Sequence, residues 1–136
     1  MRPKQRNAGV VGAACAKPRL DVVTRNAINQ GLIPGPRYLA GSQEITVAGG
    51  LGDETLPHLP FPEFSFGVLV SGAEEMRKAV RMFLKYGVDH VKLNLSGDNF
   101  TPTSPAGTTW MSDEEVAIAV REAHMRGKRV AAHARS

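Results

Sequence analysis

The amino-acid sequence predicts an α/β fold, a portion of a (β/α)8 barrel with about four parallel strands and three helices. Three observations lead to this prediction. Short apolar runs alternate with amphipathic helical segments along the 136 residues, which is the pattern of βαβ units in a parallel sheet. Each helical segment ends at a glycine that leads into the next apolar run. Connections after strands are long and those after helices are short, as expected of a barrel whose upper face carries functional loops.

The first unit lies near the N-terminus. Val10–Ala14 is a short apolar run and a candidate strand. Leu20–Gln30 carries apolar residues on one helical face, and Gly31 ends this pattern. Tyr38–Ala40 is the next apolar run. We therefore expect a strand, a helix and a second strand, joined by the right-handed crossover that such units adopt almost without exception.

The second unit contains the clearest helix, Ala73–Tyr86. Its apolar residues recur with the spacing of a half-buried helical face: Met76, Ala79, Val80, Phe83 and Leu84. Ser71 and Glu74 have the spacing of a capping box, and Gly87 stands where a left-handed cap ends a helix. The strand Val91–Leu95 is expected to follow.

The third unit repeats this arrangement. Ser112 and Glu115 form a second potential capping box before the helix Asp113–Arg126. Gly127 then leads into the apolar run Val130–Ala134. We expect this run to be the fourth parallel strand.

Two segments show little periodicity and are predicted to be loops. Gly41–Gly67 and Ser96–Met111 are rich in glycine and proline, and each follows a strand. In parallel α/β folds the loops after the carboxyl ends of the strands carry the functional site. We therefore expect the functional residues near these two loops.

The length indicates one domain, residues 1–136, that forms only part of a barrel. A closed (β/α)8 barrel needs about 250 residues. The last predicted strand would also have an exposed edge with no helix after it, which is unusual for a parallel sheet. We expect a piece of a larger protein, in which residues 1–9 form a basic N-terminal arm.

Composition and charge exclude several classes of protein. The chain has 22% charged residues and no apolar run of the length, about 20 residues, that a membrane-spanning helix needs. It has no signal-peptide pattern, and its single cysteine, Cys15, excludes an intramolecular disulfide, so a cytoplasmic location is expected. Residues 1–25 contain six of the 17 basic residues and one of the 13 acidic ones. Because residues 1–25 have no interleaved aromatic residues, we expect no nucleic-acid partner. The lack of a long apolar run leads us to expect no membrane partner.

Lys92 interrupts an otherwise apolar predicted strand. A buried lysine is unfavourable unless it is paired or used chemically. The alternative is a lysine at the start of the strand whose amine reaches solvent. The period of two in a strand places Lys92, Asn94 and Ser96 on one face, the expected barrel interior.

His133 is the only polar residue in its apolar run. A hydrogen-bonded histidine of the core is the alternative interpretation. One strand–loop–helix–strand unit separates it from Lys92, so both residues should lie on adjacent strands and face the same mouth. Two polar groups that converge there indicate a functional site.

Four motifs occur in one order along the chain. They are Gly31–Arg37 (GLIPGPR), Val88–Lys92 (VDHVK) with Ser96-Gly97, Met111–Glu115 (MSDEE) and Gly127–Ala134 (GKRVAAHA). Together they resemble the metal-dependent amidohydrolase superfamily, in particular its imidazolonepropionase-like and prolidase-like branch. The resemblance begins at about Val10 and covers nearly the whole chain.

This resemblance implies a (β/α)8 barrel with one or two divalent metal ions, zinc being expected. The lysine that matches Lys92 is carboxylated by CO2 in such enzymes, and the resulting carbamate bridges two metals. The histidine that matches His133 is a metal ligand. A carbamate oxygen and an imidazole both suit zinc. The implied activity is hydrolysis of a C–N bond in a small amide, a cyclic amide or a dipeptide-like substrate.

The chain departs from the family pattern in ways that affect the expected site. It has no His-x-His pair, and Leu51 stands where many relatives have a histidine in a Gly-Gly-x-Gly loop. Arg135 follows His133 where the second histidine of a His-Ala-His sequence is common; it is a candidate for holding a substrate carboxylate or a solvated arginine. With Asn94 and Ser96 it makes up the predicted substrate-binding set.

We assign no catalytic acid or base within the chain, and expect it to be inactive by itself. Two other interpretations remain. Lys92 could form a Schiff base in a barrel lyase or aldolase, or the chain could be a non-catalytic remnant. The expected partner is a small amide, and association of identical copies is left open.

Overall fold

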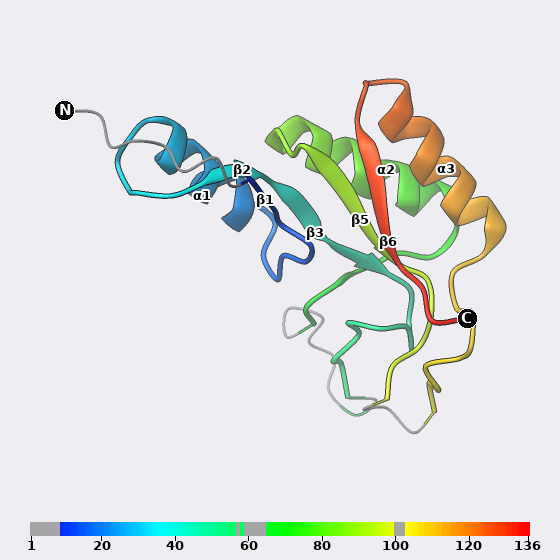
Figure 1. The fold of residues 1–136 in the computed structure, drawn as a ribbon. Helices are drawn as coiled ribbons and strands as arrows, with labels where there is room; N and C mark the ends of the chain where they lie inside the picture. Colours follow the sequence, from blue (N-terminus) through cyan, green and yellow to red (C-terminus); the bar gives the residue numbers. More distant parts are fainter. Residues whose placement is uncertain (1–8, 57, 59–64, 100–102) are drawn as a thin grey trace.

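The computed structural model describes residues 9–56, 58, 65–99 and 103–136. Their strands are all parallel, in a two-stranded sheet of order β1-β2 and a four-stranded sheet of order β4-β3-β5-β6. Along the chain the elements are β1 (Gly9–Val11), α1 (Leu20–Asn29), β2 (Arg37–Leu39), β3 (Gly41–Thr46), β4 (Val68–Leu69), α2 (Gly72–Tyr86), β5 (His90–Asn94), α3 (Asp113–His124) and β6 (Arg129–His133). Helices α2 and α3 lie together beside the larger sheet, and α1 lies with β1 and β2 at the other end (Figure 1). The predicted parallel α/β class with three helices is confirmed. The basic arm, apart from Gly9, lies outside the described residues.

The predicted loop Gly41–Gly67 is wrong at its start. Gly41–Thr46 is strand β3, an interior strand of the larger sheet that pairs with both β4 and β5. Directly after the predicted loop, Val68–Leu69 forms the short strand β4. Strand β3 was missed because glycine and polar residues dominate it, as expected of a strand with one polar face.

The helix ends agree with the sequence at three of the four predicted signals. The capping box of α3 is present: the Ser112 hydroxyl accepts from the Glu115 N–H at 3.3 Å, and the Glu115 carboxylate accepts from the Ser112 N–H at 2.8 Å. Gly87 has a φ of 87° and ends α2 as a left-handed cap, and Gly127 after α3 also has a positive φ, 67°. At the start of α2 the Ser71 side chain makes no capping hydrogen bond.

Another interaction replaces the expected box at Ser71. The Glu75 carboxylate accepts the Ser71 N–H at 2.7 Å, and the Glu115 carboxylate of α3 accepts the Gly72 N–H at 2.7 Å. Because Glu115 also accepts from Ser112, one carboxylate joins the N-termini of the two helices. A negative charge at a helix N-terminus interacts favourably with the helix dipole.

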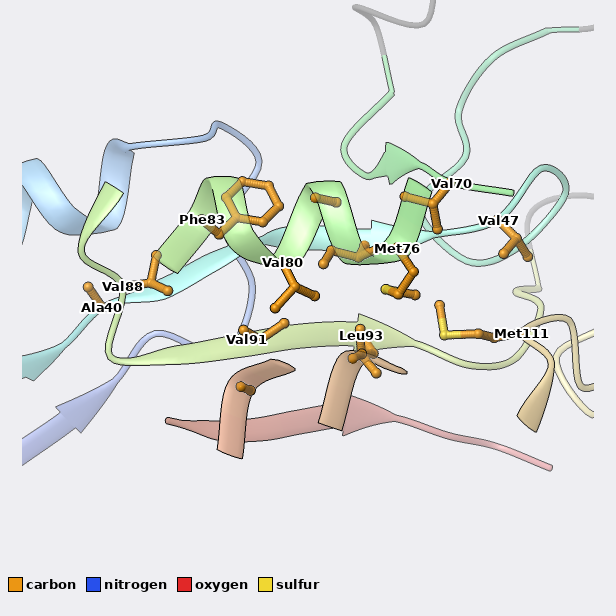
Figure 2. Close-up of a cluster of buried hydrophobic side chains, with 14 of the residues drawn as sticks. Ala40, Val47, Val70, Met76, Val80, Phe83, Val88, Val91, Leu93 and Met111 are labelled. Atoms are coloured by element: carbon orange, nitrogen blue, oxygen red, sulfur yellow. The ribbon is translucent and has the colours of Figure 1, made fainter. Parts of the chain in front are cut away.

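The hydrophobic core lies between the larger sheet and its two helices. Val91 of β5 points toward Val80 of α2 (Figure 2), and both are fully buried, as are Leu93 of β5 and Phe83 and Met76 of α2. Burial of each large side chain contributes about 1.5–3 kcal/mol. Since successive residues of a strand point to opposite faces, the residues that alternate with Val91 and Leu93 face away from the helices. None of the described helices is long and apolar enough to cross a bilayer.

Candidate metal-binding site

Lys92 lies in the middle of β5 on the face away from α2. In the register of the sheet it is opposite Glu44 of β3 and Ala131 of β6. The residue is only 7% exposed and lies in the middle of the strand, whereas the alternative interpretation placed it at the start of the strand. Burial lowers the pKa of the Lys92 amine, and the nearby charge of Glu44 opposes this effect in part. A desolvated amine of this kind has an increased neutral fraction, which is the nucleophilic form.

His133 is the last residue of β6 and lies opposite Asn94 of β5. Asn94 is two residues from Lys92, so the three side chains share one face of the sheet. The prediction that Lys92 and His133 lie on neighbouring parallel strands and face the same side is therefore confirmed. Their role as metal ligands remains a prediction.

The environment of His133 favours its neutral imidazole. Burial lowers the pKa of His133, the positive charges of Lys92 and Arg135 lower it further, and Glu44 opposes them. The Arg135 Nε–H donates to His133 Nε2 at 3.1 Å, so this nitrogen carries a lone pair. His133 is half-buried at the sheet surface rather than in the core. A neutral imidazole is the form that binds metals, and in this structure the Arg135 N–H occupies its Nε2 lone pair.

Asn94 is fully buried and connects β3 to a loop. Its Nδ2 donates to Glu44 Oε2 at 2.6 Å and to the Leu51 carbonyl at 2.9 Å. Because both partners accept, they fix which way round the amide lies. Asn94 Oδ1 is then buried without a hydrogen-bond partner among the described residues.

Ser96 and Arg135 are joined to each other. The Ser96 hydroxyl is fully buried and accepts the Arg135 backbone N–H at 3.1 Å. The Ser96 carbonyl accepts the Leu51 N–H at 3.0 Å. Ser96 thus supports the backbone around the site, whereas the Arg135 side chain is exposed beside His133. Substrate contacts by these residues stay predictions.

Comparison with known proteins finds solved structures and a curated sequence that resemble this chain. No family model matches the chain. The solved structure of an amidohydrolase gives a TM-score of 0.77 and 30% identity, covering 93% of this chain and 32% of that one. A Xaa-Pro dipeptidase with methionine in its active site gives a TM-score of 0.79 and 28% identity, with the same coverage of both chains. Ochratoxinase from Aspergillus niger is 29% identical over 123 residues, and its crystal structure gives a TM-score of 0.77. In sequence and fold the chain is therefore similar to a part of proteins of the amidohydrolase superfamily.

The chain covers only part of these amidohydrolases. It spans 25% of the length of the curated ochratoxinase sequence and 31% of the chain in its crystal structure. The parallel strands and three helices of this chain therefore correspond to a portion of the amidohydrolase barrel, as the sequence predicted.

The Gly49–Gly52 loop lies directly over the polar residues. A Cβ atom on Gly52, whose φ is 89°, would lie 2.9 Å from Glu44 Oε2 and 3.1 Å from Asn94 Nδ2. Glycine is therefore needed for the close approach of the backbone. Asp53, which follows the loop, accepts the Gly49 and Thr55 N–H groups at 2.8 and 3.1 Å, so it holds the loop in shape.

Glu44 is the site residue that the sequence analysis missed. It is half-buried on β3, opposite Lys92, within the segment that was predicted to be a loop. A signal was present, because Ile45 and Val47 alternate with Glu44 and Thr46 as in a strand with one polar face. The run is short, and the glycines on both sides of it obscured this pattern.

The described side chains fit a divalent cation in part. A neutral imidazole, a carboxylate and the unpartnered Asn94 Oδ1 are donors that such ions accept. No group of three His, Cys, Asp or Glu residues meets in a metal-binding arrangement within the ranges that the structure describes. A third strong donor would therefore have to come from Lys92 after carboxylation.

Proposed function

We propose that the protein to which this chain belongs is a metal-dependent hydrolase that cleaves a C–N bond of a small amide, cyclic amide or dipeptide-like substrate. The observation that carries the proposal is the placement of Lys92 and His133 on one face of neighbouring strands. The relatives support the reaction class, because they include a dipeptidase and an amidohydrolase. In the proposal, both residues are metal ligands.

The buried amine of Lys92 is suited to carboxylation. Its lowered pKa favours the neutral amine, whose nitrogen attacks the carbon of CO2 to form a C–N bond. A proton leaves the nitrogen for solvent, and a carbamate anion remains. The cationic side chain thereby becomes an oxygen donor. When bound, a divalent metal, zinc in our proposal, would activate a water molecule and polarise the scissile carbonyl.

His133 and Arg135 have separate proposed roles. His133 offers the metal a neutral nitrogen. The Arg135 guanidinium is exposed beside it and would hold a carboxylate at the end of the substrate. Asn94 and Ser96 support the site, because they form hydrogen bonds with Glu44, the Leu51 carbonyl and the Arg135 backbone N–H.

The proposal is tested on the full-length protein. Turnover of a panel of N-acyl amino acids, dipeptides and cyclic amides is measured with zinc and bicarbonate. We expect metal-dependent hydrolysis that is lost in Lys92→Ala and His133→Ala. The matched controls Lys85→Ala and His124→Ala alter exposed residues of α2 and α3 and should retain activity. Hydrolysis that survives Lys92→Ala and His133→Ala would refute the proposal.

One alternative also has an observation in its favour. A buried amine with a lowered pKa suits a Schiff-base lysine as well as a carbamate. Borohydride trapping of a carbonyl substrate on Lys92 would support this lyase or aldolase. Metal uptake that depends on bicarbonate would support the hydrolase.

Three further statements belong to the proposal. The substrate is a small molecule, the protein acts in the cytoplasm, and it uses no nucleic acid or membrane as a partner. The 136-residue chain alone should not hydrolyse amides, because no catalytic acid or base is assigned within it. Loss of a positioned acid or base lowers rates by about 10²–10⁴-fold.

A further inference from the structure

Glu44 faces the same space as the two proposed metal ligands. It is opposite Lys92 in the register of β3 and β5, and Lys92 shares its face with His133 of β6. Neighbouring strands lie about 4.8 Å apart, so the backbones of β3 and β6 are separated by about 10 Å across β5. A glutamate side chain and an imidazole ring that lean toward each other can span that distance.

Asn94 holds the Glu44 carboxylate in this position. The hydrogen bond from Asn94 Nδ2 to Glu44 Oε2 is 2.6 Å long, and a second bond to the Leu51 carbonyl fixes the amide. The close approach of Gly52 limits the movement of the carboxylate from above. Glu44 is therefore oriented by the protein before any ligand binds.

Asn94 gives an independent indication that a ligand belongs on this face. Its residue is fully buried, and its Oδ1 has no hydrogen-bond partner among the described residues. A buried acceptor without a donor is unfavourable and rare in folded proteins. A cation, or water molecules bound to it, would satisfy this oxygen.

The charges of the site favour a cation between Glu44 and Lys92. Before carboxylation, the carboxylate lies opposite an amine that can carry a positive charge. After carboxylation, two anionic oxygen groups face each other and repel. A divalent cation between them restores neutrality, and two oxygen donors with one imidazole suit zinc.

We propose that Glu44 is a metal ligand that binds the same divalent cation as His133 and the carboxylated Lys92. The inference rests on the proposed metal site and extends it, because it gives this chain three protein donors. In this role Asn94 is a positioning residue that acts through Glu44. The consequence is that the 136-residue chain should bind a divalent cation without any other segment.

The test is the affinity of the 136-residue chain for zinc. Isothermal titration with zinc chloride in bicarbonate buffer compares the unaltered chain with Glu44→Gln and His133→Ala. Glutamine retains an oxygen that accepts from Asn94 but lacks the charge. Glu114→Gln is the matched control, since Glu114 is exposed on α3, on the other side of the sheet.

We expect one zinc per chain, affinity at least about 10-fold weaker in Glu44→Gln and His133→Ala, and affinity within about twofold for the control. Loss of a mere outer-shell partner already weakens metal binding by about 10–100-fold. As a second measurement, ¹³C NMR of chains labelled at the glutamate carboxylates should show one resonance that moves on addition of zinc. This NMR measurement uses the unaltered chain and therefore does not depend on the folding of a variant.

The outcomes separate this inference from the proposed function. Unchanged affinity in Glu44→Gln, or no moving glutamate resonance, shows that Glu44 is not a ligand and leaves the hydrolase proposal intact. Absence of zinc binding by the unaltered chain also overturns the inference, whereas the hydrolase is judged by turnover of the full-length protein. Zinc binding that requires Glu44 together with a full-length protein that hydrolyses nothing would support the ligand and refute the hydrolase.

Discussion

The N-terminal unit β1–α1–β2 and the larger sheet with α2 and α3 bury their helices to different degrees. Helix α2 buries Met76, Ala79, Val80 and Phe83 against the sheet. Helix α1 buries only Asp21 and Val22, while Leu20 and Val23 are 55% and 54% exposed. Large apolar side chains are also exposed on β1, on β2 and after α1: Val10, Val11, Leu39, Leu32 and Ile33. Since packing of an amphipathic face supplies most of the stability of a helix, the first unit should be the less stable part.

Polar contacts join the two regions where apolar packing is sparse. Arg25 of α1 donates to Asp89 at 2.7 Å and to the Gly87 carbonyl at 2.9 Å, and Asp89 also accepts the Ala40 N–H at 2.8 Å. Asp21 of α1 accepts the Gly41 N–H at 3.0 Å. The first unit is thus held mainly by directed interactions, and the larger sheet by its core.

The largest expected effect comes from Phe83→Ala. Phe83 is fully buried, so its truncation should destabilise the chain by about 3–5 kcal/mol. Leu20→Ala removes an exposed apolar residue of α1 and should change the free energy of unfolding by less than about 0.5 kcal/mol. Urea unfolding followed by circular dichroism measures both. Similar losses in the two variants would show that α1 is packed in solution as firmly as α2.

Arg25→Ala tests the connection between the regions. It removes the charged hydrogen bonds to Asp89 and Gly87, which should destabilise the first unit by about 1–3 kcal/mol. Hydrogen exchange should quicken in α1 while the β5 amides keep their protection. Lys17→Ala, at an exposed position before α1, is the control. Equal acceleration in α1 and β5 would mean that the two regions unfold together.

Acid should destabilise the larger sheet with α2 and α3 by protonating Glu122. The carboxylate joins α3 to Arg81 of α2 and to Arg126, and these hydrogen bonds lower the pKa of Glu122 to about 2. A carboxyl whose pKa is lower in the folded state stabilises the fold above its unfolded pKa of about 4.3, and this contribution is lost as pH falls toward 2.

Glu122→Gln should therefore weaken the dependence of the melting temperature on pH between 5 and 2. It should also lower the melting temperature at pH 7, by the smallest of the three effects on unfolding, because its arginine partners can be solvated. The control is Glu114→Gln, which changes an exposed residue of the same helix. A pH profile of Glu122→Gln parallel to that of the unaltered chain would assign the acid sensitivity to other carboxyl groups.

The fold was predictable where the pattern is local. The spacing of Met76, Val80 and Phe83 identified α2, and the Ser112–Glu115 pair marked the start of α3. Strand β3 was not predictable in the same way, because its identity depends on pairing with β4 and β5 rather than on its own composition. The first capping box failed for a related reason, since Glu75 and a residue of another helix accept the N–H groups there.

The candidate site was likewise predictable from the sequence only where its features are local. The sequence by itself determined that Lys92 and His133 share a face, because alternation along a strand and one βαβ unit between them are local features. Only the tertiary structure decided that Glu44 lies opposite Lys92 and that Asn94 joins Glu44 to the Gly49–Gly52 loop. These contacts depend on the register of strands that are about 50 residues apart in the chain and on the path of a loop over them. Such long-range geometry is set by the packing of the whole sheet, which no short window of sequence contains.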